Sequence, residues 1–170
     1  MDKAITTALM VITGMITVTL LFNAVYPAVL DGSDAMSNMQ SRLDERLTSQ
    51  VEIVHAAAEL DSSGLWQDTN GDGHFSVFIW VKNVGSNRII PIEGTDLFFG
   101  PEGNFGRIPH QSEAGGSFPY WDYDVENATE WTPTATLKIT IHYSSVQAAG
   151  RYFVKVAAPN GISDETYLSM

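Results

Sequence analysis

The chain opens with a long segment of apolar and uncharged polar residues. From Ala4 to Leu30 the sequence AITTALMVITGMITVTLLFNAVYPAVL contains no Asp, Glu, Lys, Arg or His, and Lys3 and Asp31 flank it. As a helix, the segment would extend roughly 40 Å, which is more than the hydrocarbon core of a bilayer. It therefore predicts a membrane-spanning helix. We expect a kink near Pro27, because proline removes one backbone donor from the helix.

Apolar residues then recur in steps of three and four, which is typical of one face of an amphipathic helix. They are Met36, Met39, Leu43, Leu47, Val51, Val54 and Ala58. This pattern predicts that the helix continues as a stem to about Leu60. Residues 1–60 then form an N-terminal helical domain, and residues 61–170 form a second domain.

Beyond residue 61, short segments of alternating polarity are separated by Gly, Pro and Asn turns. The expected strands are Phe75–Val84, Thr95–Gly100, Thr134–Tyr143 and Arg151–Pro159. In the third, Leu137, Ile139 and Ile141 alternate with Lys138, Thr140 and His142, which predicts one buried and one solvent-exposed face. The overall prediction is an α+β fold: a long apolar helix followed by an antiparallel, Ig-like β-sandwich.

Residues 100–133 show weak periodicity and many Gly and Pro residues, so we expect a long loop there. We expect its aromatic side chains to pack the loop: Phe105, Phe118, Tyr120, Trp121 and Trp131.

Charge and motif content exclude several functions. The formal net charge is −11, which opposes binding to nucleic acid. The chain has no nucleotide-binding Gly-rich loop and no G-x-S-x-G or H-E-x-x-H motif, and its four histidines lack metal-ligand spacing. We therefore do not expect an enzyme, and no cofactor is required.

Three segments carry a resemblance to a known family. They are Ile79–Ser86 (IWVKNVGS), Asp96–Gly100 (DLFFG) and Gly150–Val156 (GRYFVKV) with the later Pro159-Asn160-Gly161. Together with the N-terminal helix, they resemble the archaellins of the type IV pilin-like superfamily, which are the subunits of the archaeal swimming filament.

The resemblance implies an extracellular homopolymer for motility. The subunit would be anchored in the inner membrane before assembly, and its partners would be identical subunits and the archaellum assembly and motor machinery. Its helix would then pack in the filament core through Ile5, Leu9, Ile12, Gly14, Ile16, Leu20 and Phe22. Gly14 would allow close approach of neighbouring helices. Family precursors are cut just before the apolar run, so Lys3 and Ala4 mark a possible leader cleavage site, unless Met1 is itself the mature start.

Two smaller sites are expected. Asp68, Asn70 and Asp72 stand at the first, third and fifth positions of a calcium-type loop with Gly73 at the sixth, and His74 and Ser76 could add oxygens. The bidentate Glu of such a loop is missing, so any calcium ion would bind weakly. An Asn-Gly-Asp-Gly turn without an ion is the alternative. Asn127, in Asn127-Ala128-Thr129, is a candidate N-glycosylation site, which would make the chain a glycoprotein.

Alternatives to a filament subunit remain open. One is a pilin-like archaellum accessory protein near the motor whose β-domain binds a surface-layer partner, or an adhesive pilin at the cell envelope. Another is a membrane-anchored module that binds a ligand or calcium through the Asp68–Asp72 loop, with exposed Trp121 and Trp131 as stacking platforms.

Overall fold

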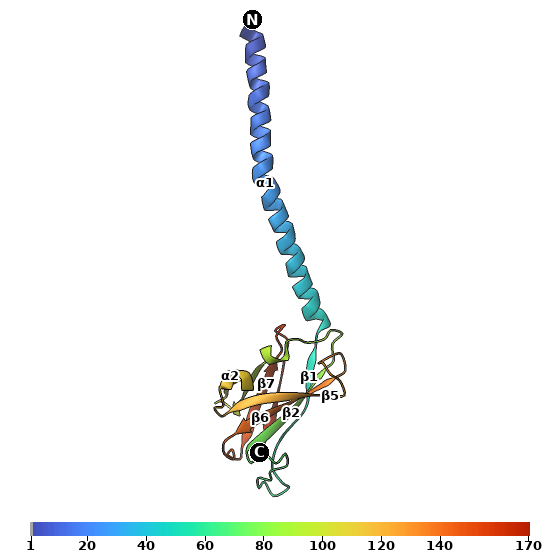
Figure 1. The fold of residues 1–170 in the computed structure, drawn as a ribbon, viewed down its shortest axis with the longest axis vertical. Coiled ribbons are helices and arrows are strands. Elements are labelled where there is room, and N and C mark those ends of the chain that lie inside the picture. Colours follow the sequence, from blue (N-terminus) through green and yellow to red (C-terminus); the bar gives the residue numbers. More distant parts are fainter. Residues whose placement is uncertain (1) are drawn as a thin grey trace. The chain divides into compact units, whose positions relative to one another are not determined.

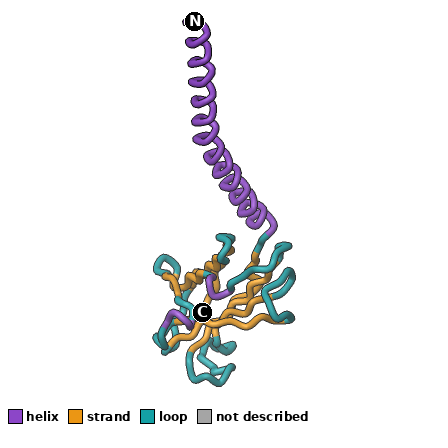
Figure 2. Tube along the Cα trace, turned by 45° about the horizontal axis from the view of Figure 1, so that its top comes forward, coloured by secondary structure: helices purple, strands orange, loops and turns teal. Residues whose placement is uncertain are grey.

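The computed structural model describes the chain from residue 2 to residue 170, without the side chains of residues 45–47. The chain divides into two compact units, the first ending at Asp44 and the second covering Glu45–Met170. The first unit is most of helix α1, Asp2–Thr48 (Figure 1). The second is a β-domain built from two groups of strands (Figure 2).

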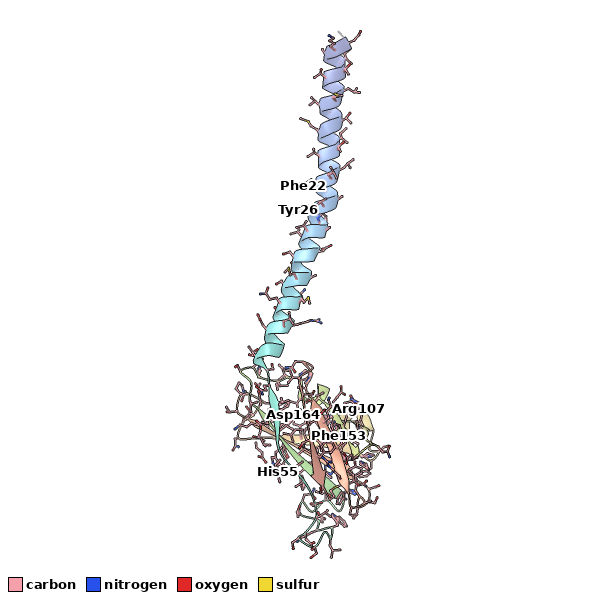
Figure 3. The ribbon with its side chains drawn as sticks, turned by 180° about the vertical axis from the view of Figure 1, so that it is seen from behind. Phe22, Tyr26, His55, Arg107, Phe153 and Asp164 are labelled. Atoms are coloured by element: carbon pink, nitrogen blue, oxygen red, sulfur yellow. The ribbon has the colours of Figure 1, made fainter. Side chains whose placement is uncertain are left out.

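Helix α1 is continuous through Pro27. Its axis changes direction gently just beyond the labelled Phe22 and Tyr26 (Figure 3), in the region where the sequence predicts a kink. By length and composition alone, the stretch Asp2–Asp44 could cross a membrane: its mean hydropathy reaches 2.1, and none of it is buried.

The prediction that the helix continues to about Leu60 is wrong. The helix ends at Thr48, and β1, Val51–Ala58, pairs antiparallel with the second strand. The register of this pair shifts between Ile53 and His55, so a β-bulge inserts an extra residue. Apolar residues that would alternate in steps of two are therefore spaced irregularly, and their spacing imitates that of a helix.

The β-domain is a sandwich of two four-stranded antiparallel sheets, as expected. One sheet has the order β1-β2-β6-β5, and the other has the order β4-β3-β7-β8. The remaining strands are β2 Phe75–Asn83, β3 Asp96–Pro101, β4 Gly106–Ile108, β5 Tyr120–Glu126, β6 Thr136–Tyr143, β7 Arg151–Ala157 and β8 Ser163–Ser169. The Ile53 amide of β1 donates to Asp164 of β8 at 2.7 Å, which links the two sheets at one edge.

The core lies between the sheets and follows the period-two pattern. Val77, Ile79 and Val81 of β2 and Leu137 and Ile139 of β6 have no exposed surface. The opposite face of β6 differs from the prediction: Thr140 and His142 are only 8% exposed. Neighbouring side chains cover this face, so an alternating strand does not guarantee a solvated side.

Residues 100–133 contain more regular structure than the predicted loop. They include β4, the short helix α2 (Gln111–Ala114) and β5. Trp121 and Trp131 are completely buried, so these two side chains do pack, whereas Phe105 remains 49% exposed. Within β5, Trp121, Tyr123 and Val125 alternate with Asp122, Asp124 and Glu126, so the sequence does carry a period-two signal here that the prediction of a loop overlooks.

The junction between α1 and the sandwich uses the Lys82-Asn83-Val84-Gly85 segment. Buried Asn83 donates from Nδ2 to the carbonyls of Asn87 and Trp131 at 2.8 and 3.1 Å, and its Oδ1 accepts from the Gly85 amide. A Cβ on Gly85 would lie 2.5–2.8 Å from the backbone of residues 48–50. The Asn and the Gly of this family-like motif therefore hold the turn against the start of β1.

Candidate functional site

The apolar surface of α1 is the first candidate site. The predicted packing residues Ile5, Leu9, Ile12, Ile16, Leu20 and Phe22 are 55–65% exposed on the isolated chain. The hydroxyls of Thr6, Thr7, Thr13, Thr17 and Thr19 each donate to the carbonyl four residues earlier. These threonines are thus satisfied within the helix, which makes the surface compatible with lipid.

A shallow groove runs along one side of this helix. Its lining includes Leu9 and Gly14 from the predicted packing set. Thr13, which lies between these two residues in the sequence, and Thr17 line it as well. Apart from the adjoining residues and the backbone of its own helical turns, no described atom lies within 4 Å of a Cβ built at Gly14. Contact between copies of this helix stays a prediction. Cleavage at Lys3 and Ala4, in the first turn of α1, also stays a prediction, and Met1 lies outside the described residues.

The calcium-type loop lies between β1 and β2, and its oxygens already accept hydrogen bonds. The Asp68 carboxylate accepts from the amides of Gly71 and Gly73 at 2.6 and 3.0 Å. Asp72 accepts from the His74 amide at 2.7 Å and from Asn70 Nδ2 at 2.9 Å. Among the side chains that the structure describes, no group of three or more His, Asp or Glu residues is arranged to hold a metal ion. Calcium binding remains a prediction, and an ion would have to replace these bonds.

The buried side chain of Glu59 accepts hydrogen bonds from the same loop. Its side chain is only 2% exposed, and its Oε1 accepts from the Thr69 amide and hydroxyl and from the Asn70 amide. Its Oε2 accepts from Trp66 Nε1 and the Ser76 amide at 3.4 and 3.3 Å. Because five donors surround it, the buried carboxylate needs no cation to fix the loop.

His142 joins this loop to the sheet. Its Nδ1 lies 2.9 Å from Asp72 Oδ2, and its Nε2 lies 3.3 Å from Asp122 Oδ1, although not in a well-aligned hydrogen bond. The Tyr120 ring stacks on the imidazole with centroids 4.9 Å apart. Asp122, and after it Asp72, raise the pKa of His142 above its usual value, against the opposing effect of burial.

The pKa of Asp72, which pairs with His142, shifts in the opposite direction. Burial opposes ionisation of Asp72, but the His74 amide, Asn70 and His142 together lower its pKa. The calcium-type motif contains Asp72 but not Glu59, Asp122 or His142, the other members of this cluster. Only the order of the strands in the sheet brings these residues together, and no local motif marks them.

The candidate glycosylation site is accessible. Asn127 is exposed, follows β5 and has a positive φ of 64°. Thr129 is also exposed. A glycan at Asn127 stays a prediction that this geometry permits.

Comparison with known proteins gives the chain a context. No family model matches it. An uncharacterized protein of Archaeoglobus fulgidus is 22% identical over 171 residues, which covers 98% of both chains. The archaellum periplasmic stator protein FlaG from Sulfolobus acidocaldarius has a similar structure, with a TM-score of 0.53 and 25% identity. That match covers 71% of this chain and 99% of FlaG.

A second solved structure points the same way. It is the complex of the stator proteins FlaF and FlaG from the same organism, with a TM-score of 0.52 and 25% identity over 70% of this chain and 88% of that one. The solved relatives are archaellum stator proteins. A 47-residue helix is too short to account for a match of 71% of 170 residues, so most of the match comes from the β-domain.

These relatives connect the chain to the archaellum but not to its filament subunit. They fit the alternative of an accessory protein better than the main expectation of an archaellin in an extracellular homopolymer. Neither relative is described as an enzyme. The stacking-platform alternative loses its two proposed residues, because Trp121 and Trp131 are fully buried.

Proposed function

We propose that the protein is a membrane-anchored accessory component of an archaellum, whose β-domain contributes to the stationary part of the motor outside the membrane. The observation that carries this proposal is the likeness of the chain to the stator protein FlaG, over 99% of that chain's length. The helix supplies the anchor, since Asp2–Asp44 is long and apolar enough to cross a bilayer.

The proposal assigns different tasks to the two units. The helix holds the protein in the membrane, and the β-domain resists the reaction torque by binding other components. The solved complex of FlaF with FlaG supports another stator protein as a partner for this β-domain. A surface-layer component is a further candidate partner. No step requires catalysis by this chain.

A gene deletion tests this function. Cells without the protein should still secrete filaments but swim poorly, because a filament without a fixed counterpart cannot transmit torque. The full chain should restore swimming, and a variant that lacks residues 2–44 should not. Normal swimming of the deletion strain would refute the stator role. Loss of the filaments themselves would instead support a filament subunit.

A further inference from the structure

The outer face of the β1-β2-β6-β5 sheet carries a row of carboxylates. Trp121 of β5 is fully buried, so the alternate residues Asp122, Asp124 and Glu126 lie on the opposite, outward face. We call these three residues the acidic row. Strand β5 stands at the end of its sheet, so the row lies along an edge of the domain.

An aromatic pair lies on the same face, across β6 from the acidic row. Phe78 and Trp80 point outward from β2 and are half-buried. The ammonium of Lys138, from β6, lies 4.7 Å from the Phe78 ring centre and 5.9 Å from that of Trp80. Trp80 Nε1 donates to Glu126 Oε1 at 3.1 Å. This face therefore already holds one cation on its rings, and a carboxylate orients the larger ring.

Asp124, the middle carboxylate of the row, has no partner among the side chains that the structure describes. Asp122 lies near His142, and Glu126 accepts from Trp80. Asp124 is exposed and makes no side-chain hydrogen bond or ion pair with any residue that the structure describes. Lys138 is its register partner on β6, but the Lys138 ammonium lies over the rings of β2.

The other charges of the face do not neutralise the row. Lys82 is the remaining basic residue on β2. It lies level with Glu126, with Thr136 of β6 between them, and its register partner on β1 is Glu52. Among the side chains that the structure describes, Lys82 forms no ion pair with the row. Carboxylates bind ammonium and guanidinium groups through charge-assisted hydrogen bonds, and aromatic faces bind them through cation–π contact. A surface that carries both can therefore bind lysine or arginine side chains.

We infer that this face docks a lysine- or arginine-bearing segment of a protein partner, with Asp124 and Glu126 pairing its cations and Trp80 packing on its side-chain stems. The net charge of −11 favours approach of such a segment. Charges on an edge strand also discourage edge-to-edge aggregation, but that role requires no oriented tryptophan. The inference concerns the chemistry of the face and does not depend on which machine the protein serves.

The test uses the full chain in nanodiscs of zwitterionic lipid. The probe is a fluorescein-labelled peptide of alternating lysine and threonine, and its glutamate–threonine counterpart is the peptide control. Asp124→Lys and Glu165→Lys change the net charge equally, but Glu165 is exposed on β8 of the other sheet. We expect Asp124→Lys to weaken lysine-peptide binding at least tenfold and Glu165→Lys less than twofold. Trp80→Leu should weaken it several-fold without changing the charge.

Carbodiimide coupling followed by mass spectrometry then maps the contact. Lysines of the bound peptide should couple mainly to Asp124 and Glu126. Coupling spread over exposed carboxylates of both sheets, or equal losses from the two charge-reversal variants, would show attraction by net charge alone and overturn the inference. Absence of any binding at low ionic strength would overturn it as well.

Discussion

At the residue scale, Gly85 allows the turn after β2 to pack closely against the backbone of residues 48–50. A Cβ at this position would meet Gln50 N at 2.5 Å and Thr48 O at 2.7 Å. Both are backbone atoms, so they cannot rotate away as a flexible side chain would. The glycine of the Lys-Asn-x-Gly motif is thus required by packing at the junction.

We therefore expect Gly85→Ala to lower the free energy of unfolding of the β-domain by about 1–3 kcal/mol, the usual cost of overpacking. Thermal unfolding of the full chain in detergent, followed by circular dichroism, measures the change. Gly106→Ala is the matched control, because a Cβ there meets nothing within 4 Å. Equal stability of the two variants would contradict this account of the junction.

Glu59 is the second residue with a specific structural task. The two carboxylate oxygens of Glu59 accept five buried or half-buried hydrogen bonds. Glu59→Gln removes the negative charge and replaces one of these acceptor oxygens with an NH2 donor. We expect a cost of about 1–3 kcal/mol and faster hydrogen exchange at the Thr69, Asn70 and Ser76 amides. Glu165→Gln, on an exposed strand position, should leave exchange in the loop unchanged. Unaltered exchange in Glu59→Gln would show that the loop holds its conformation without this carboxylate.

The His142–Asp72 pair predicts a pH dependence of stability. The pKa of His142 is raised above 6.5, so its contribution is fully present below pH 6.5 and is lost as pH rises through the folded-state value. The pKa of Asp72 is lowered below 3.8, so its contribution is present above that pH and is lost as pH falls through the folded-state value. Both contributions are fully present between pH 3.8 and pH 6.5, so the pair stabilises the loop most in that range.

Urea unfolding of the full chain between pH 5 and pH 9 measures this effect. The wild type should lose more stability over that interval than His142→Asn. His55→Asn serves as the control, because His55 is exposed on β1. If the stability of the wild type and that of His142→Asn changed with pH in parallel, the proposed link between the His142–Asp72 pair and stability would be wrong.

At the element scale, the proposed function makes α1 the membrane anchor. Ile12→Arg combined with Ile16→Arg places two cations within the apolar run, each costing about 2.5–3.5 kcal/mol near the centre of a spanning helix. We expect the carbonate-resistant membrane fraction to fall at least tenfold. Met36→Arg combined with Met39→Arg is the control, since both residues lie beyond the uncharged segment and are exposed. Full membrane retention of the first variant would contradict the anchor role.

The elements also show what the sequence can and cannot predict. Strands β2, β3, β6 and β7 lie where alternation and turn residues indicate them, because burial on one face imposes period two. The sequence predicts helix where β1 lies, because the bulge in this strand breaks that period. The Glu59 and His142 clusters depend on contacts between residues far apart in the chain, which local patterns do not encode.

At the scale of the whole molecule, the plan of the chain fits two kinds of protein. An apolar N-terminal helix followed by a β-sandwich suits both a filament subunit and an anchored accessory protein, so the sequence pattern alone does not decide between them. The likeness to FlaG favours the accessory protein. In the proposed function the helix is an anchor, and no assembly of identical helices is required.

The most direct measurement compares where the protein resides. Quantitative mass spectrometry of sheared filaments and of washed cell-envelope membranes gives its copy number in each fraction. Our account predicts that the chain stays with the membranes, at far fewer copies than the filament subunit. Recovery of this chain as the main component of purified filaments would contradict the account.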